Sequence, residues 1–223
     1  MDGTLALAGG SEWKGQPSAD AELLGASGGD TVTVVPTAAA YERPDHVLER
    51  AAKWFGELGA KVESLEAFRR TDAFDDRLVQ QARSASFLYL TSGTPMHLRS
   101  VLFDSPLWEA VVDAWRGGAV LCAAGESAAA LSTHMMDPRG GAFTVGLGLL
   151  TTMTVVPHAS SMSEEKWHRT LRLAPRGLDV VGIDDHTTLV WRASGWTVSG
   201  EGRVTVTRDG RSLGLEELPR PVQ

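Results

Sequence analysis

Ser127 lies in a short motif that can present a nucleophile. The motif, Gly-Glu-Ser-Ala-Ala, follows an apolar stretch and opens into an alanine-rich segment. A nucleophile elbow is a tight turn from a strand into a helix, so the residues two before and two after the nucleophile must be small, as Gly125 and Ala129 are. The backbone N–H of Ala128 would then point at a developing oxyanion. The motif predicts acyl transfer at Ser127, but a serine in this position can equally be the N-cap of the helix.

A serine nucleophile needs a base, and His158 is the best-placed histidine. It ends the apolar stretch 153–159, and ligands of parallel sheets lie beyond the carboxyl ends of strands. The remaining histidines fall in helical patterns or in polar loops and turns: His46, His97, His168, His134 and His186. We therefore predict that His158 is the base.

Two acidic residues, Asp184 and Asp185, separate the apolar stretches 179–183 and 187–191. Consecutive residues of an extended chain face opposite ways, so at most one of these carboxylates can orient the imidazole of His158. The other is solvated or braces the turn. A simple acidic turn explains the pair equally well, and the residues alone leave the choice open.

The elements that must position these side chains alternate along the chain. Short apolar runs that end at turn residues are followed by amphipathic stretches, which is typical of strands alternating with helices. The sequence predicts strands at 4–10, 31–39, 61–68, 87–93 and 119–125, helices at 44–59 and 76–85, and one or two helices at 95–118. This order predicts an α/β fold, with a parallel sheet covered by helices on both sides.

The pattern changes after residue 141. A strand is predicted at 153–159, a helix at 163–173, and a series of short strands separated by glycine-containing turns at 179–210. Such strands are expected to be antiparallel. No linker or repeat divides the sequence, so we predict one domain over residues 1–223. Residues 14–30 are predicted to form a surface loop near the site.

Composition limits the possible partners. The 223 residues are 43% hydrophobic and carry a formal net charge of -7, which opposes binding to nucleic acid. Residues 5–8 are too short for a signal-peptide core, and no run is long enough to span a bilayer. The single cysteine, Cys122, cannot form an intramolecular disulfide. We expect a soluble, cytoplasmic protein with no cofactor, metal, nucleic-acid or membrane partner.

The sequence resembles the serine peptidases of the cyanophycinase and aspartyl dipeptidase (dipeptidase E) family, which has the class I glutamine amidotransferase-like fold. The blocks that carry the resemblance run nearly the full length: LALAGGSEW, TVVPTAAAY, GELGAKVESLEAF, LYLTSGTPMHL, VLCAAGESAAA, GLGLL, VVPHA, VGIDDHTTLVW and VSGEGRVTV. It implies a three-layer α/β/α sandwich with a mainly parallel, flavodoxin-like sheet and antiparallel C-terminal strands. It also implies a homodimer.

The resemblance assigns roles to individual residues. It implies a triad of Ser127, His158 and Asp185, with Gly93 and Ala128 supplying the oxyanion N–H groups. The substrate-binding residues that it implies are Thr94, Glu126, Arg169 and Arg172. The sequence departs from the family at Ala129, where the family has glycine, at Asp185, where it has glutamate, and at 92–95, where Ser-Gly-Thr-Pro replaces Gly-Gly-Asp-Gln.

The activity implied is hydrolysis of an amide bond in a small peptide or an isopeptide-linked aspartyl compound. The departures leave room for a second interpretation, a catalytically silent module that binds small molecules. The amidotransferase branch of the fold has a cysteine at the elbow. Because Cys122 lies five residues before Ser127, we predict a buried apolar role for it and no thiolate chemistry.

Overall fold

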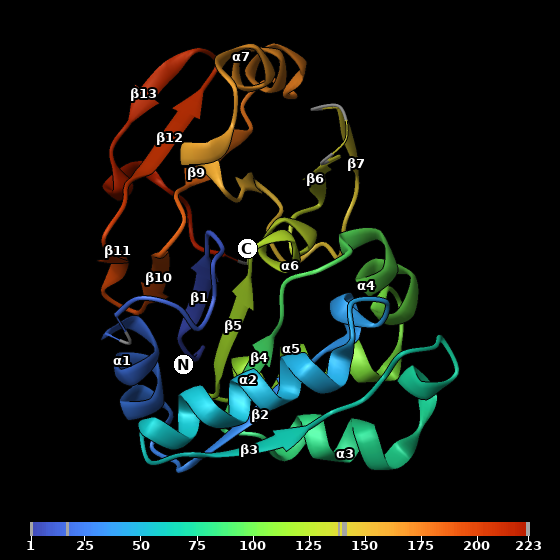
Figure 1. The fold of residues 1–223 in the computed structure, drawn as a ribbon. Helices are drawn as coiled ribbons and strands as arrows, with labels where there is room; N and C mark the ends of the chain where they lie inside the picture. Colours follow the sequence, from blue (N-terminus) through green and yellow to red (C-terminus); the bar gives the residue numbers. More distant parts are fainter. Residues whose placement is uncertain (1, 17, 138, 140–141, 222–223) are drawn as a thin grey trace.

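The computed structural model describes residues 2–16, 18–137, 139 and 142–221. Its largest element is a seven-stranded sheet of order β11-β10-β1-β5-β4-β2-β3 (Figure 1). The five strands from β1 to β3 in this order are parallel, whereas β10 and β11 are antiparallel. The strands are β1 (Leu5–Ala8), β2 (Thr31–Val35), β3 (Lys61–Ser64), β4 (Phe87–Leu90), β5 (Val120–Ala124), β10 (Thr187–Arg192) and β11 (Gly195–Gly200).

Helices cover both faces of this sheet, which confirms the predicted three-layer α/β/α architecture. Side chains of β5 alternate between two hydrophobic cores: Leu121 and Ala123 join one, and Cys122 and Ala124 join the other, as expected where successive strand residues point to opposite faces. The first core is completed by α3 (Asp76–Ser84), α4 (Pro95–Leu102) and α5 (Pro106–Arg116), and the second by α1 (Ser18–Ser27) and α2 (Pro44–Glu57).

Residues 14–30, predicted to be a loop, contain the helix α1 instead. Its alanines and leucines are spread around the helix, so the sequence shows no apolar stripe, and Leu23 alone among its described residues is buried. Two contacts fix the helix. Leu23 packs into the second core, and Asp20 accepts a hydrogen bond from Trp54 Nε1 of α2 at 2.8 Å. Tertiary packing therefore determines that this segment is helical, which its local sequence pattern does not indicate.

The C-terminal strands are shared between two sheets. A second sheet of order β13-β12-β9-β8 consists of β8 (Met153–Val156), β9 (Asp179–Ile183), β12 (Val204–Arg208) and β13 (Arg211–Leu213). The predicted strand at 153–159 therefore belongs to this sheet and not to the parallel one. Strand β9 continues into β10 of the main sheet through residues 184–186, so the sheets meet at the predicted acidic turn (Figure 1).

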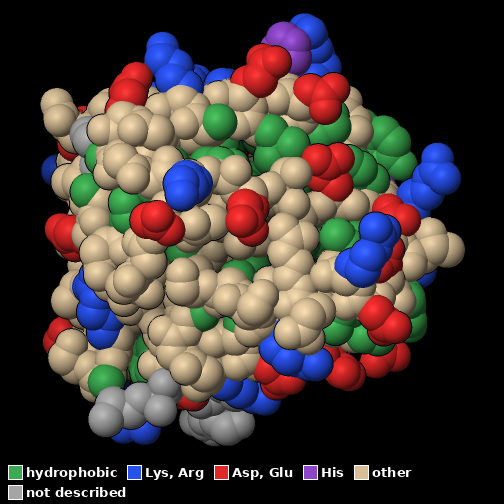
Figure 2. Space-filling view, turned by 90° about the horizontal axis from the view of Figure 1, so that it is seen from below, with side chains coloured by type: hydrophobic (Ala, Val, Ile, Leu, Met, Phe, Trp, Pro, Cys, Tyr) green, Lys and Arg blue, Asp and Glu red, His purple; other side chains and the backbone are tan. Residues whose placement is uncertain are grey.

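Shorter elements complete the fold. These are the helices α6 (Glu126–Ala130) and α7 (Glu164–Leu173), a hairpin of β6 (His134–Met136) and β7 (Phe143–Val145), and the 3-10 turns η1 (Thr37–Ala39), η2 (Asp72–Phe74), η3 (Ala159–Ser161) and η4 (Leu215–Glu217). Within the described ranges, no helix combines the length and the hydropathy needed to cross a bilayer. On the face seen in Figure 2, basic and acidic side chains are interspersed, in keeping with the net charge of -7.

Candidate active site

The tight turn between β5 and α6 is centred on Gly125. The strand ends at Ala124, the helix begins at Glu126, and Gly125 between them has φ 53° and ψ -126°. This backbone region strains any residue other than glycine, and it is the kind of turn that lifts a side chain above the end of a strand. The predicted position of this turn, at Ser127, is therefore wrong by two residues.

Ser127 lies within the first turn of α6, where it is completely buried. Its hydroxyl donates a hydrogen bond to the carbonyl oxygen of Thr91 at 2.5 Å. It is therefore neither the turn residue nor the N-cap of the helix, since Gly125 occupies the N-cap position. The buried hydroxyl ties α6 to the end of β4.

The corrected position of the turn also affects Ala128, the predicted oxyanion donor. Its N–H donates to the carbonyl oxygen of Gly125 at 3.0 Å, and the residue is buried. The N–H that directly follows the turn is that of Glu126. Ala128 therefore lies two residues beyond the position expected of an oxyanion donor, and its assignment is wrong.

Ser127→Ala is expected to lower the free energy of unfolding by about 1–3 kcal/mol, because the buried Thr91 carbonyl loses its hydrogen-bond donor. The same substitution should leave turnover nearly unchanged, since the hydroxyl does not reach the site. Urea denaturation and a kinetic assay of the same preparation check both halves. A hundredfold loss of turnover with stability unchanged would restore Ser127 as the nucleophile.

His158 follows β8 and turns its imidazole toward the main sheet. Its backbone is in the left-handed region, with φ 53° and ψ 36°, and its N–H donates to the carbonyl oxygen of Gly9 at 2.8 Å. The ring packs directly on Gly10, where an added Cβ would lie 2.0 Å from Cε1. Only glycine at residue 10 allows this approach. The turn after β1 thus holds the histidine that the second sheet supplies.

Asp185 is the carboxylate that contacts His158. Oδ1 of Asp185 lies 2.8 Å from Nδ1 of the imidazole and accepts a second hydrogen bond, at 2.8 Å, from the hydroxyl of Ser11. The hydroxyl of Ser161 donates to Oδ2 at 3.4 Å. The side chain of Asp184 instead accepts the N–H of Arg203 at 3.0 Å. The predicted contact is confirmed, and the choice that the residues left open falls on Asp185.

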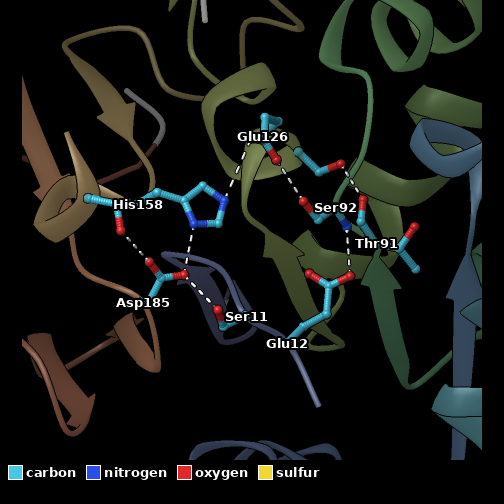
Figure 3. A network of polar contacts seen from close by, with 9 residues as sticks. Ser11, Glu12, Thr91, Ser92, Glu126, His158 and Asp185 are labelled. Carbon is cyan, nitrogen blue, oxygen red and sulfur yellow. Dashed lines mark hydrogen bonds and ion pairs between the residues drawn. The ribbon is translucent and has the colours of Figure 1, made fainter. Parts of the chain in front are cut away.

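Two further side chains complete the polar network on the other side of the imidazole (Figure 3). Oε1 of Glu126 lies 3.6 Å from Nε2 of His158, and Oε2 of Glu126 accepts a hydrogen bond from the hydroxyl of Ser92 at 2.7 Å. Glu126 was predicted to bind substrate, and the structure places it between the histidine and a serine. The imidazole is thus flanked by two carboxylates.

These carboxylates control the protonation of the site. Glu126 does most to raise the pKa of His158, burial opposes it, Asp185 adds to it, and the result is about 9 instead of 6.5. Burial alone would raise the pKa of Glu126 and of Asp185, but their hydrogen bonds, including those with His158, hold both below the ordinary values. Near neutral pH the imidazole is therefore protonated and both carboxylates are charged.

The network has a defined pH window. Because the pKa of His158 is raised by folding, its contribution to stability is complete below pH 6.5 and is lost as the pH rises through about 9. The two carboxyl groups, whose pKa values are lowered, contribute above their ordinary values of 4.5 and 3.8 and lose this contribution as the pH falls.

Glu126→Gln is expected to lower the pKa of His158 by at least ~1 unit, because it removes the main charge that favours the imidazolium form. An NMR titration of the His158 Cε1 proton measures the change directly. The matched control is Glu165→Gln, which alters an exposed carboxylate of α7 away from the cavity and should leave the titration of His158 unchanged. An unchanged titration of His158 in Glu126→Gln would show that Glu126 does not control its charge.

Glu12 is a functional candidate that the sequence analysis missed. Its Oε1 accepts the backbone N–H of Ser92 at 3.1 Å, and its Oε2 is buried without a hydrogen-bond partner among the described residues. Burial is the main reason that its pKa is raised to about 7, from an ordinary 4.5. A signal was present in the sequence, because a carboxylate directly after the Gly-Gly-Ser turn of β1 lies at a carboxyl end of the sheet.

A cavity of about 370 Å³ opens beside His158 and Glu126. Pro95, Met136, Met162 and Lys166 are among its other lining residues. This volume is sufficient for a small organic substrate.

The predicted substrate-binding arginines are not at this cavity. Arg169 and Arg172 are exposed and line a separate groove on α7, together with Glu165 and His168. Because α7 turns these positions outward, the two arginines do not line the cavity beside His158, and their role in substrate binding stays a prediction.

The loop after β4 lies close to the turn, as predicted. Thr94 donates its N–H to the carbonyl oxygen of Ala38 at 2.8 Å and precedes α4. Gly93 has φ 148°, and an added Cβ would lie 2.4 Å from the same oxygen, so the position requires glycine. The roles of Gly93 in oxyanion binding and of Thr94 in substrate binding stay predictions.

Cys122 is buried inside β5, as predicted, and burial raises the pKa of its thiol well above the ordinary value. Within the part of the chain that is described, no group of three or more His, Cys, Asp or Glu side chains has the arrangement of a metal site.

Solved structures with similar folds include a peptidase from an acI-B1 Actinobacterium, with a TM-score of 0.84 and 24% identity over 96% of this chain and 93% of that one. A candidate Peptidase E protein from Listeria monocytogenes EGD-e has a TM-score of 0.71 and 18% identity, covering 91% of this chain and all of that one. At these identities the likeness establishes the fold: a mixed α/β architecture found in peptidases.

Sequence relatives identify the family. Cyanophycinases from Nostoc sp. (strain PCC 7120 / SAG 25.82 / UTEX 2576) and Trichormus variabilis (strain ATCC 29413 / PCC 7937) are each 29% identical to the chain over 188 residues. Those residues are 78% of this chain and 62% of each cyanophycinase, so the chain spans about three fifths of these relatives' length. Peptidase family S51 matches residues 5–198. The chain therefore belongs to peptidase family S51.

Proposed function

We propose that the chain hydrolyses an amide bond in a small peptide or an isopeptide-linked aspartyl compound. One observation carries the proposal. The imidazole of His158, held by Asp185 at 2.8 Å, faces the turn between β5 and α6, where a Cβ added at Gly125 would lie 3.6 Å from Nε2. An oriented imidazole beside such a turn is the arrangement that amide hydrolysis by acyl transfer requires. Membership of a peptidase family and the cyanophycinase relatives support the same activity.

His158 carries protons in this proposal and Asp185 orients it. With a pKa of about 9, the imidazole begins the reaction protonated at neutral pH. It can therefore donate a proton to the amine as the C–N bond breaks, which makes it a general acid in the first half of the reaction. Asp185, supported by Ser11 and Ser161, fixes the ring so that Nε2 faces the cavity.

The proposed substrate is small and acidic. The cavity of about 370 Å³ accommodates a dipeptide-sized molecule. Lys166 lines it, where an ammonium group suits a substrate carboxylate. Glu126 at the same cavity would repel a carboxylate from the side of the imidazole, so we expect the substrate to bind with its acidic group toward Lys166.

Asp185→Asn is expected to lower turnover of aspartyl dipeptides by roughly 100- to 10,000-fold, because the imidazole loses the carboxylate that orients it. The matched control is Asp184→Asn, which alters the neighbouring carboxylate and should leave turnover within about threefold, because that side chain is tied to Arg203. Chromatography of released amino acids from α- and β-linked dipeptides measures both. Equal losses in the two variants would show that Asp185 has no special role.

A second candidate function is a silent module that binds small amides without cleaving them. The observation that favours it is Gly125, because the turn position has no side chain to act as nucleophile. Calorimetric titration with the same dipeptides distinguishes the two functions. Saturable binding with no product supports the silent module, whereas product formation excludes it.

A further inference from the structure

The space above Gly125 is filled by a serine from the neighbouring strand. A Cβ built on Gly125 would lie 2.4 Å from Oγ of Ser92 and 3.0 Å from its Cβ. The register of the sheet explains the proximity. Strands β4 and β5 are parallel with Leu90 opposite Ala123, so the residues two positions further along, Ser92 and Gly125, also lie opposite each other at the carboxyl ends of the strands. A hydroxyl is thus present where the turn itself supplies none.

We propose that Ser92 is the nucleophile of the amide hydrolysis, an inference that rests on the proposed function. Its Oγ lies within 2.7 Å of Oε2 of Glu126 and donates its proton to that carboxylate. The other oxygen of Glu126 lies 3.6 Å from Nε2 of His158. The hydroxyl, the carboxylate and the imidazole form one chain that ends at Asp185 (Figure 3).

Other hydroxyls near the network are buried or lie away from the Nε2 side of the imidazole. Ser127 is completely buried and donates to Thr91. Ser11 and Ser161 both donate to the carboxylate of Asp185, on the far side of the imidazole from Glu126. Ser92 is only partly buried and lies on the Nε2 side. Within the described network, Ser92 is therefore the hydroxyl that can lose its proton to a carboxylate on the Nε2 side of the imidazole, beside the turn at Gly125.

The proposed reaction balances in two halves. Ser92 Oγ forms a bond to the substrate carbonyl carbon while its proton passes to Oε2 of Glu126. The C–N bond then breaks, and the leaving amine takes a proton from Nε2 of His158. The proton on Glu126 moves to the now neutral imidazole. Water attacks the acyl ester, gives one proton to Glu126 and thence to the Oγ of the departing Ser92, and releases the free acid.

The loop after β4 is suited to this role. Oε1 of Glu12 accepts a hydrogen bond from the backbone N–H of Ser92 at 3.1 Å, and this bond fixes the position of Ser92. Gly93 follows directly, and the N–H of the residue after a nucleophile is a common oxyanion donor. Its backbone is held in a glycine-only conformation against Ala38. The oxyanion role predicted for Gly93 is thus compatible with a nucleophile at residue 92.

The test is covalent labelling with a fluorophosphonate, followed by peptide mapping, together with aspartyl dipeptide turnover on the same proteins. We expect the adduct on Ser92 in the wild type. Ser92→Ala should form no adduct, and its turnover should be at least ~1,000-fold lower than that of the wild type. The matched control is Ser100→Ala, which removes an exposed hydroxyl of α4 outside the network and should keep the adduct. In Ser92→Gly/Gly125→Ser, the adduct should move to residue 125.

The outcomes separate this inference from the proposed function. If the wild type cleaves dipeptides and Ser92→Ala cleaves them at the same rate, Ser92 is not the nucleophile although the hydrolysis stands. An adduct that maps to Ser127 would also overturn the assignment. If Ser92 is labelled but no dipeptide is cleaved, the nucleophile is supported and the proposed hydrolysis is not. Circular dichroism of each variant confirms that it folds.

Discussion

Replacing His158 with alanine is expected to lower kcat/KM for aspartyl dipeptides by roughly 100- to 10,000-fold, the range for loss of a proton-transferring side chain. The reason is geometric. Asp185 holds Nε2 of the imidazole in place as a proton donor beside both the cavity and the turn at Gly125. Without it, the leaving amine must take its proton from water.

The control is His168→Ala. This histidine is exposed on α7 and lies away from the cavity that His158 lines, so its loss should change kcat/KM by less than about threefold. Steady-state kinetics of both variants, with thermal unfolding to show equal stability, provide the comparison. If both variants remain as active as the wild type, proton transfer by His158 plays no part in turnover.

Gly125→Ala is expected to lower the free energy of unfolding by about 2–4 kcal/mol. About 1–3 kcal/mol of this comes from a side chain at φ 53° and ψ -126°. The remainder comes from the contact of the new Cβ with Ser92, which would be only 2.4 Å. Because the second part depends on Ser92, it should disappear when residue 92 is glycine.

A double-mutant cycle isolates that contact. Ser92→Gly in the Gly125→Ala background should recover stability, with a coupling of at least ~1 kcal/mol between the two positions. The control is Gly56→Ala in α2, where an added Cβ meets nothing within 4 Å and the helix gains propensity. Urea denaturation measures all of these variants. Additive effects at 125 and 92 would contradict the close approach of Ser92 to the turn.

The alternation of strands and helices could be predicted because each buried strand carries its own signal. Strand β5 is apolar on both faces, and α2 repeats apolar residues at helical spacing around Phe55. The segment around α1 could not be predicted, because its few contacts come from distant residues such as Trp54. The division of the C-terminal strands between two sheets depends equally on long-range pairing, which no local pattern contains.

The position of the turn could not be predicted from its motif. A nucleophile elbow is found by small residues two positions on either side, but residues 123–130 are nearly all small. The motif therefore fits equally well with residue 125 or residue 127 at the turn. The end of β5 determines which residue occupies the turn, and that end is set by the pairing of β5 with β1 and β4. The backbone of Gly125 then fixes the turn.

The contact between His158 and Asp185 was predictable, but the residues around it were not. His158 and Asp185 each follow a buried strand, β8 and β9, and these strands pair in parallel, so both residues emerge on the same side. Ser92 became a candidate only through the register of β4 against β5, which the sequence does not state. Arg169 and Arg172 kept helical spacing, but the orientation of α7 exposes them. Spacing within an element constrains which residues share a face, but not which way that face points.

The most direct test of the central claim, that the site at His158 hydrolyses amide bonds, is to incubate the wild-type chain with α- and β-aspartyl dipeptides in water enriched in heavy oxygen. Mass spectrometry of the products should find free amino acids with the heavy isotope in the newly formed carboxyl group. His158→Ala, treated in the same way, should produce none above background. If the wild type leaves every dipeptide intact, the claim is contradicted.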